Sequence, residues 1–167
     1  MEIRQATIND LEKIMEVAAK TVKIMNEEGN DQWSDKYPAE KDFKADIENS
    51  ALFVAFMDDK VVGSIAIDRI GGKNYDLIEW TLPDNNYYVI HRLMVDPEIR
   101  GGGIASKLLS FAEVFAREND TFYLKTDTYA INEKAQNLFL KNGFNKVGEL
   151  HFPGKERPFY CFDKTFK

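Results

Sequence analysis

Cysteine, histidine and excess positive charge are scarce in this sequence of 167 residues. Its single cysteine, Cys161, cannot form an internal disulfide, which predicts a cytoplasmic setting. Its two histidines are far apart, and no carboxylate cluster has ligand spacing, so no metal site is expected. The formal net charge of -6 disfavours non-specific binding to nucleic acid.

Long apolar runs are also missing. No run approaches the ~20 apolar residues of a membrane-spanning helix, and the polar N-terminus lacks the apolar segment of a signal peptide, so no membrane partner is expected. Hydrophobic residues make up 44% and charged residues 30%, the balance of a globular protein. A chain of this length is predicted to form one domain, residues 1–167, with a sizeable core.

The sequence does contain a glycine turn between an apolar run and a helix. The run ends at Asp96-Pro97, three glycines occupy positions 101–103, and apolar residues then recur at helical spacing at Ile104, Leu108, Phe111, Ala112 and Phe115. Glycines allow a ligand to approach the backbone, and the first N–H groups of a helix point outward. This combination predicts a site for a phosphate or pyrophosphate.

Two common phosphate-binding loops do not fit these residues. A Walker loop needs a lysine before its Ser or Thr, but Lys107 follows Ser106. A dinucleotide fingerprint needs a third glycine where Ser106 stands, in an early strand-helix-strand unit. The remaining pattern is Arg-x-x-Gly-x-Ala, formed by Arg100, Gly103 and Ala105. It resembles the acyl-CoA pyrophosphate motif of the GNAT (Gcn5-related N-acetyltransferase) superfamily. An ordinary strand-to-helix turn is the alternative.

The order of predicted elements extends this resemblance to nearly the whole chain. Strands are expected at residues 2–6, 52–57, 61–70, 87–95, 122–126, 144–152 and 159–166. Helices are expected at 11–28 (capped by Thr7 or Asn9), 39–49 and 132–141, and over the apolar positions 104–115 after the glycine turn. The excursion at 71–86 is expected to be a long loop. This order predicts a mixed sheet with helices on its faces.

A second motif supports the same family. Asn132-x-x-Ala135-x-x-Leu138-Phe139, followed by Gly143-Phe144, is similar to the fourth-helix motif of GNAT proteins. The resemblance implies an α/β (α+β) fold: a mixed, mostly antiparallel twisted sheet with a central splayed strand and helices on both faces.

The resemblance also implies acetyl-CoA as co-substrate. Its pyrophosphate would lie over Arg100, Gly101, Gly102, Gly103, Ile104 and Ala105, with Ser106 adding a hydroxyl donor. Its pantetheine would pair with the backbone of Leu93, Met94 and Val95. Asn132 would contact the cofactor, cap its helix, or do both.

Acetyl transfer to an amine needs a proton acceptor. An alkyl ammonium with a pKa near 10 must lose a proton before it attacks, and imidazole suits this step at neutral pH. His91 lies two residues before Leu93, where some family members that use arylalkylamine-type substrates have a basic histidine. A structural histidine inside the sheet is the alternative, and a bulge in this strand could change its facing. A backbone N–H at Met94 or Val95 could stabilise the oxyanion.

The acceptor site is expected to be walled by aromatic residues and one carboxylate: Trp33, Tyr37, Tyr88 and Asp127. Such aromatics can equally hold loops on the core, and Asp127 can be a turn or cap residue.

Two functions remain open. The first is an N-acetyltransferase that moves acetyl from acetyl-CoA to a primary amine of a small molecule or peptide by direct attack. The second is a non-catalytic acyl-CoA-binding or regulatory module. His91 favours the first; Phe139 favours the second, because family members usually have a tyrosine there that can protonate the departing sulfur. Tyr129 or Tyr160 could supply a substitute acid. The sequence leaves the oligomeric state open, although dimers are frequent in this family.

Overall fold

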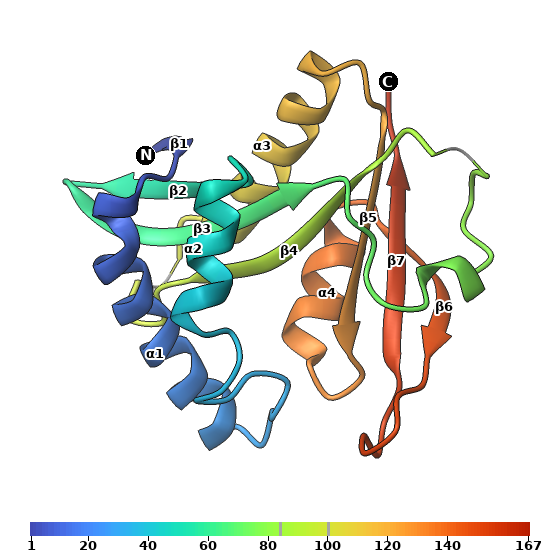
Figure 1. Cartoon of the computed structure of the whole chain (residues 1–167), viewed down its shortest axis with the longest axis horizontal. Helices are drawn as coiled ribbons and strands as arrows, with labels where there is room; N and C mark the ends of the chain where they lie inside the picture. Colours follow the sequence, from blue (N-terminus) through green and yellow to red (C-terminus); the bar gives the residue numbers. More distant parts are fainter. Residues whose placement is uncertain (84, 100) are drawn as a thin grey trace. The chain divides into compact units, whose positions relative to one another are not determined.

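A computed structural model describes residues 1–83, 85–99 and 101–167 (Figure 1). Its strands are β1 (Glu2–Gln5), β2 (Leu52–Met57), β3 (Lys60–Asp68), β4 (Tyr88–Val95), β5 (Tyr123–Tyr129), β6 (Asn145–Leu150) and β7 (Phe159–Thr165). Its α-helices are α1 (Leu11–Glu27), α2 (Glu40–Glu48), α3 (Ile104–Glu118) and α4 (Glu133–Lys141), with 3-10 turns η1 (Ile8–Asp10) and η2 (Tyr75–Leu77). The strands follow the order β1-β2-β3-β4-β5-β7-β6.

The sheet is mixed and mostly antiparallel, which confirms the predicted fold class. β1 pairs with β2, β2 with β3, β5 with β7, and β6 with β7, each antiparallel. β4 and β5 are parallel, with Tyr88 opposite Leu124 and Val89 opposite Lys125. The chain forms two compact units, one from residues 1–67 and 91–111 and the other from residues 68–90 and 112–167.

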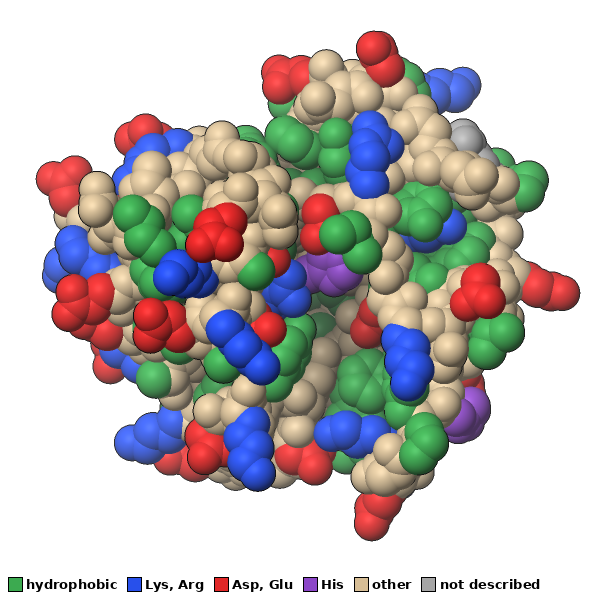
Figure 2. Space-filling model, viewed as in Figure 1, with side chains coloured by type: hydrophobic (Ala, Val, Ile, Leu, Met, Phe, Trp, Pro, Cys, Tyr) green, Lys and Arg blue, Asp and Glu red, His purple; other side chains and the backbone are tan. Residues whose placement is uncertain are grey.

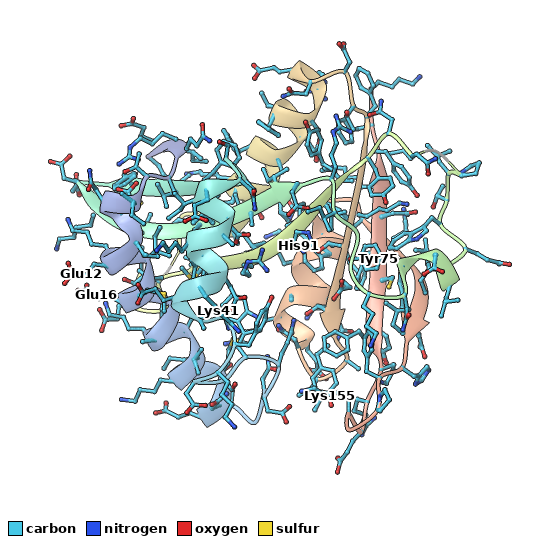
Figure 3. All side chains as sticks on the ribbon, in the orientation of Figure 1. Glu12, Glu16, Lys41, Tyr75, His91 and Lys155 are labelled. Atoms are coloured by element: carbon cyan, nitrogen blue, oxygen red, sulfur yellow. The ribbon has the colours of Figure 1, made fainter. Side chains whose placement is uncertain are left out.

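In the first unit, helices cover both faces of β2. Leu52 and Val54 share a core with Ile14 of α1 and Phe43 of α2. Phe53, between them in the sequence, packs its ring against Phe111 of α3 at a centroid distance of 5.0 Å. Successive strand residues point to opposite faces, so α1 and α2 cover one face and the first half of α3 covers the other. Figure 3 shows the exposed side of α1, where Glu12 and Glu16 extend into solvent.

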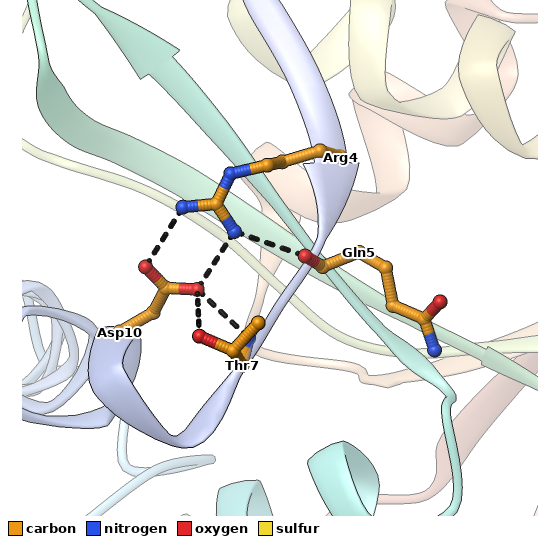
Figure 4. Close-up of polar contacts among 4 residues, drawn as sticks. All are labelled: Arg4, Gln5, Thr7 and Asp10. Atoms are coloured by element: carbon orange, nitrogen blue, oxygen red, sulfur yellow. Dashed lines mark hydrogen bonds and ion pairs between the residues drawn. The ribbon is translucent and has the colours of Figure 1, made fainter.

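The start of α1 is fixed by one carboxylate (Figure 4). Asp10 accepts a hydrogen bond from the Thr7 backbone N–H at 2.8 Å and a bidentate pair from the Arg4 guanidinium at 2.9 and 3.0 Å. Thr7 is the N-cap of η1, whereas Asp10 is the N-cap of α1, so the prediction that Thr7 or Asn9 caps this helix is wrong. The Arg4 hydrogen bond holds the pKa of Asp10 below its usual value.

In the second unit, β7 separates two apolar groups. Cys161 packs with Tyr75, Val89 and Leu150 on one face. On the other face, the neighbouring Phe162 packs against Phe139 of α4. Burial, and secondarily the Asp127 carboxylate, raises the pKa of the Cys161 thiol to about 12, so this cysteine is an inert core residue, as its apolar sequence context suggested.

One predicted strand boundary is wrong. The sequence pattern ended the fifth strand at Thr126, but β5 continues to Tyr129. Asp127, Thr128 and Tyr129 pair with Cys161, Tyr160 and Phe159 of β7. Polar Asp and Thr weaken a strand pattern in the sequence, whereas pairing with a neighbouring strand satisfies their backbone groups.

The surface carries charges of both signs. On the face in Figure 2, Lys and Arg side chains are interspersed with Asp and Glu, including over α1 and α2 at the left. Among the described residues, no helix is both long and apolar enough to cross a bilayer.

Candidate functional site

The glycine turn leads directly into α3, as predicted. Gly101, Gly102 and Gly103 have φ angles of +81°, +74° and +61°, a left-handed conformation that side chains other than glycine adopt at a cost. A Cβ added at any of the three would meet nothing within 4 Å, so the turn borders open space. Arg100, the basic residue of the motif, lies outside the described residues.

The first turn of α3 presents donors beside these glycines. The Lys107 backbone N–H bonds back along the helix to the Gly103 carbonyl at 2.9 Å. The amides of Ile104 and Ala105 lie before it in the first turn, where the backbone N–H groups of any helix have no intrahelical acceptor. The first turn has no acidic residue to compete for this region. Together with the positive end of the helix dipole, the turn can receive an anion.

The residues before the glycines are anchored on two sides. The Asp96 N–H donates to the Val62 carbonyl of β3 at 2.8 Å. The Asp96 carboxylate accepts from the Glu98 N–H at 2.9 Å and from the Lys20 ammonium of α1 at 3.3 Å. Lys20 also pairs with Glu98 at 2.8 Å. These bonds fix the position at which β4 ends and the turn begins.

Strand β4 contains an irregularity at Arg92. This residue has a φ of +46°, which is unusual for a side chain other than glycine. Tyr88 packs on Phe115 of α3, whereas Arg92 contacts Asp46 of α2. The regular strand conformation of β4 is therefore interrupted at Arg92.

His91 lies immediately before this irregularity and is half-buried (Figure 3). After Arg92, Met94 is buried in the core with α1 and α2, and the side chains of Leu93 and Val95 are half-buried. The three predicted pantetheine positions are thus packed through their side chains, which leaves only their backbone for a ligand.

The sequence did not indicate the partners of Arg92. Its guanidinium makes a bidentate ion pair with Asp46 at 2.6 and 2.5 Å, and both side chains are mostly buried. Its remaining terminal nitrogen donates to the Tyr37 hydroxyl at 3.1 Å. Asp46 and Arg92 are 46 residues apart, and no motif links them.

Gly63 was also missed. A Cβ at this position would lie 2.7 Å from the Met94 carbonyl oxygen, so only glycine allows β3 to approach β4 this closely. In the sequence it stands as an isolated glycine inside a strand pattern, which is a known sign of close backbone approach.

The predicted acceptor residues divide into two groups. Trp33 is 7% exposed within the α1–α2 core, and Tyr88 is 9% exposed under the Arg69 guanidinium, so both hold structure together and offer little surface to a ligand. Tyr37 is 43% exposed. Asp127 is half-buried and accepts a 2.5 Å hydrogen bond from the Tyr75 hydroxyl. Only Tyr37 and Asp127 retain surface for an acceptor.

Tyr75 was not singled out in the sequence, and it fixes the orientation of Asp127. Burial first, and then the Asp127 carboxylate, raise the pKa of its hydroxyl well above the usual value. Tyr75 therefore stays protonated and keeps donating to Asp127. Its ring also borders a pocket of about 490 Å³ with Trp80, Tyr87 and the buried Lys125.

Helix α4 carries the second sequence motif. The Asn132 side chain accepts from the Ala135 N–H at 3.2 Å, which confirms its capping role. Phe139 is 4% exposed, and its ring packs against Phe144 and Phe162 at centroid distances of 5.6 and 5.5 Å.

Neither tyrosine considered as a substitute acid occupies the place of Phe139. Tyr129 is buried, its ring packs on Phe159, and its oxygen accepts from the Arg157 N–H at 3.3 Å. Tyr160 is half-buried on β7, beneath the Lys146 ammonium at 3.5 Å. Within the described part of the chain, no group of three or more His, Cys, Asp or Glu is arranged to hold a metal ion.

Comparison with known proteins gives consistent matches. Residues 18–144 match the family described as Acetyltransferase (GNAT) family. Streptothricin acetyltransferase of Escherichia coli is 31% identical over 124 residues, covering 72% of this chain and 64% of that protein. Uncharacterized N-acetyltransferase YhfO of Bacillus subtilis (strain 168) is 29% identical over 166 residues, covering 91% of this chain and 95% of the relative.

Solved structures share the fold. An acetyltransferase of the GNAT family from Streptococcus agalactiae 2603 superposes with a TM-score of 0.88 at 24% identity, covering 99% of this chain and 95% of that one. The paia N-acetyltransferase from Thermoplasma acidophilum, in complex with coenzyme A, gives a TM-score of 0.73 at 22% identity, covering 99% and 98%. At these identities the likeness is one of fold.

Proposed function

The chain belongs to the acetyltransferase (GNAT) family, and we propose that it moves the acetyl group of acetyl-CoA to a primary amine of a small molecule or peptide by direct attack. Family membership and the named relatives make it an acyltransferase. The observation that carries the proposal furthest is the turn of three left-handed glycines at the N-terminus of α3.

The turn has the properties that a pyrophosphate requires. Its open Cβ positions allow close approach, and the following amides and helix dipole favour negative charge. Gly101, Gly102, Gly103, Ile104, Ala105 and Ser106 would hold this group, with Arg100 beside them by analogy with the family motif. Leu93, Met94 and Val95 would bind the pantetheine through their backbone, and Asn132 would add a side-chain contact.

His91 is proposed as the base. When bound, acetyl-CoA supplies the thioester carbonyl that the amine attacks. His91, directly or through a water, would take the proton that the amine loses, because imidazole can be neutral at physiological pH. A backbone N–H of Met94 or Val95 would stabilise the oxyanion.

Departure of the thiol does not require an acid at position 139. Phenylalanine has no proton to donate, but an ordinary thiol has a pKa near 8.5, so a thiolate can leave without full protonation. The burial of Phe139 among other rings supports a purely structural role for this residue.

Tyr37 of the first unit and Asp127 of the second unit each remain a proposed acceptor contact, taken separately. The Tyr75 hydroxyl orients the Asp127 side chain through its hydrogen bond, and a carboxylate suits the positive charge of an amine. The name of one relative, streptothricin acetyltransferase, supports a small-molecule acceptor.

The proposed function is tested by measuring CoA release from acetyl-CoA over a broad panel of amines and peptides. Transfer to at least one amine, lost in Gly103→Glu, is the expected result. Tight acetyl-CoA binding without transfer to any member of the panel would instead support the non-catalytic binding module, which the phenylalanine at position 139 favours.

A further inference from the structure

Arg92 connects three segments of the first unit through one side chain. It lies on β4, it pairs with Asp46 of α2 through two hydrogen bonds, and it reaches Tyr37 in the loop between α1 and α2. Burial of the ion pair and its bidentate geometry leave the guanidinium little freedom to move. The guanidinium nitrogen that donates to Tyr37 is therefore held in a fixed position.

The direction of that third hydrogen bond is determined by chemistry. A guanidinium has donors and no acceptor, so the Tyr37 oxygen must accept from Arg92. The Tyr37 hydrogen must then be donated to another group or to solvent. Because the side chain is 43% exposed, this donor is accessible to a ligand.

The charge of Arg92 determines which part of an acceptor can bind there. Asp46 balances the charge of Arg92, but the guanidinium, 3.1 Å from the Tyr37 hydroxyl, is the member of the pair that contacts it, so an ammonium group there would meet the cationic member first. A carbonyl or carboxylate oxygen would instead accept the Tyr37 hydrogen and be attracted by the guanidinium. Tyr37 is thus suited to a part of the acceptor other than its amine.

We propose that Arg92 is a positioning residue that holds the Tyr37 hydroxyl as a donor to the acceptor, and that the acceptor is an amine carrying a carbonyl or carboxylate group. This inference rests on the proposed function, which it deepens by naming the substrate class. Asp46 contributes to the same role, because its ion pair fixes the position of the Arg92 guanidinium.

The test compares matched acceptors in matched variants. The acceptors are α-amino amides, each paired with the alkylamine of equal length. Tyr37→Phe removes the hydroxyl from an exposed position and keeps the ring. We expect kcat/KM for the amides to fall roughly 3- to 10-fold, the usual effect of one neutral hydrogen bond, and kcat/KM for the alkylamines to change less than about 2-fold.

Arg92→Lys keeps the charge and loses the bidentate fork, so it should show the same selective loss. The control is Arg4→Lys, which breaks another bidentate Arg–Asp pair of the same unit, between Arg4 and Asp10 (Figure 4). Its ratio of amide to alkylamine activity should match that of the wild type. Acetyl-CoA affinity, measured by calorimetry, should be unchanged in Tyr37→Phe.

The outcomes separate the two proposals. Equal losses with amides and alkylamines in Tyr37→Phe, or no loss with either, would overturn the inference while the acetyl transfer itself stands. A wild-type protein that binds acetyl-CoA and acetylates no member of the panel would refute the proposed function, and the inference with it. Because Tyr37→Phe changes only an exposed hydroxyl, the result does not depend on whether Arg92→Lys folds.

Discussion

At the scale of single residues, Gly103 combines a left-handed φ of +61° with open space at its Cβ position. Alanine there should cost about 1 to 2 kcal/mol of folding free energy, through backbone strain alone. Glutamate should add a side chain that competes with the pyrophosphate. We therefore expect Gly103→Glu to remain folded and to lose most of its affinity for acetyl-CoA in calorimetry.

Gly154 offers a matched control for this substitution. It has a φ of +82°, open space at its Cβ position, and a place in the turn between β6 and β7 that is outside the proposed site. Gly154→Glu should carry a similar strain and leave acetyl-CoA affinity unchanged. Unchanged affinity in a folded Gly103→Glu would remove the phosphate role from the glycine turn.

His91 gives a second prediction for a single residue. If its neutral form takes the proton from the amine, His91→Ala should lower turnover at neutral pH by roughly 100-fold, the lower range for general base catalysis. The loss should shrink as pH rises, because more of the amine is then free. The measurement is the pH profile of turnover, and a profile in the variant that matches the wild type would make His91 a structural residue.

At the scale of elements, the N-terminus of α4 separates capping from ligand binding. Asn132→Asp should keep the cap, because aspartate and asparagine cap helices equally well. Aspartate cannot donate a hydrogen bond to a phosphate-bearing ligand and would repel it. We expect stability within about 0.5 kcal/mol of the wild type and acetyl-CoA affinity reduced about 10-fold.

Asn132→Ala completes this comparison, since it removes the cap as well and should cost about 1 kcal/mol. Urea denaturation and calorimetry on both variants give the two quantities. If acetyl-CoA binds to Asn132→Asp as tightly as to the wild type, Asn132 serves only as a cap.

Phe139 tests whether α4 can supply an acid. Its ring lies among Phe144 and Phe162, so Phe139→Tyr would place a hydroxyl in an apolar environment. We expect a loss of about 1 to 3 kcal/mol in the free energy of unfolding and no gain in turnover, because the thiolate can leave without full protonation. A rise of about 100-fold in turnover would instead show that a general acid can act from position 139 of α4.

At the scale of the whole molecule, stability should fall at alkaline pH. Burial raises the pKa of Tyr75 well above the usual value, and the Asp127 carboxylate raises it further. A group whose pKa is higher in the folded state stabilises the fold below its unfolded pKa, near 10, and loses that contribution as pH rises above it. The wild-type free energy of unfolding in urea should therefore decline between about pH 10 and 11.

Tyr75→Phe should show a shallower decline over the same range, because it has one fewer phenol to ionise on unfolding. Equal slopes in the wild type and in Tyr75→Phe would show that Tyr75 does not cause the alkaline loss.

The features that the sequence determined by itself are local ones. Helix faces, the glycine turn, the Asn132 cap and the inert Cys161 each depend on residues close together in the chain, whose spacing and conformational preference can be read directly. The family motifs belong to this class, which explains why the fold class and the glycine turn before α3 could be predicted. Gly63 was nevertheless missed, because the close contact that requires a glycine there is with the Met94 carbonyl oxygen on a different strand.

Only the tertiary structure decided the polar partners around the site. Asp46 and Arg92 are 46 residues apart, and Tyr75 and Asp127 are 52 apart. A contact between residues so far apart in the sequence depends on strand register and on the path of a loop. Neither of these produces a pattern within either segment. The same reason separates Trp33 from Tyr37: both are aromatics of one polar loop, and only the packing of that loop buried the first and left the second exposed.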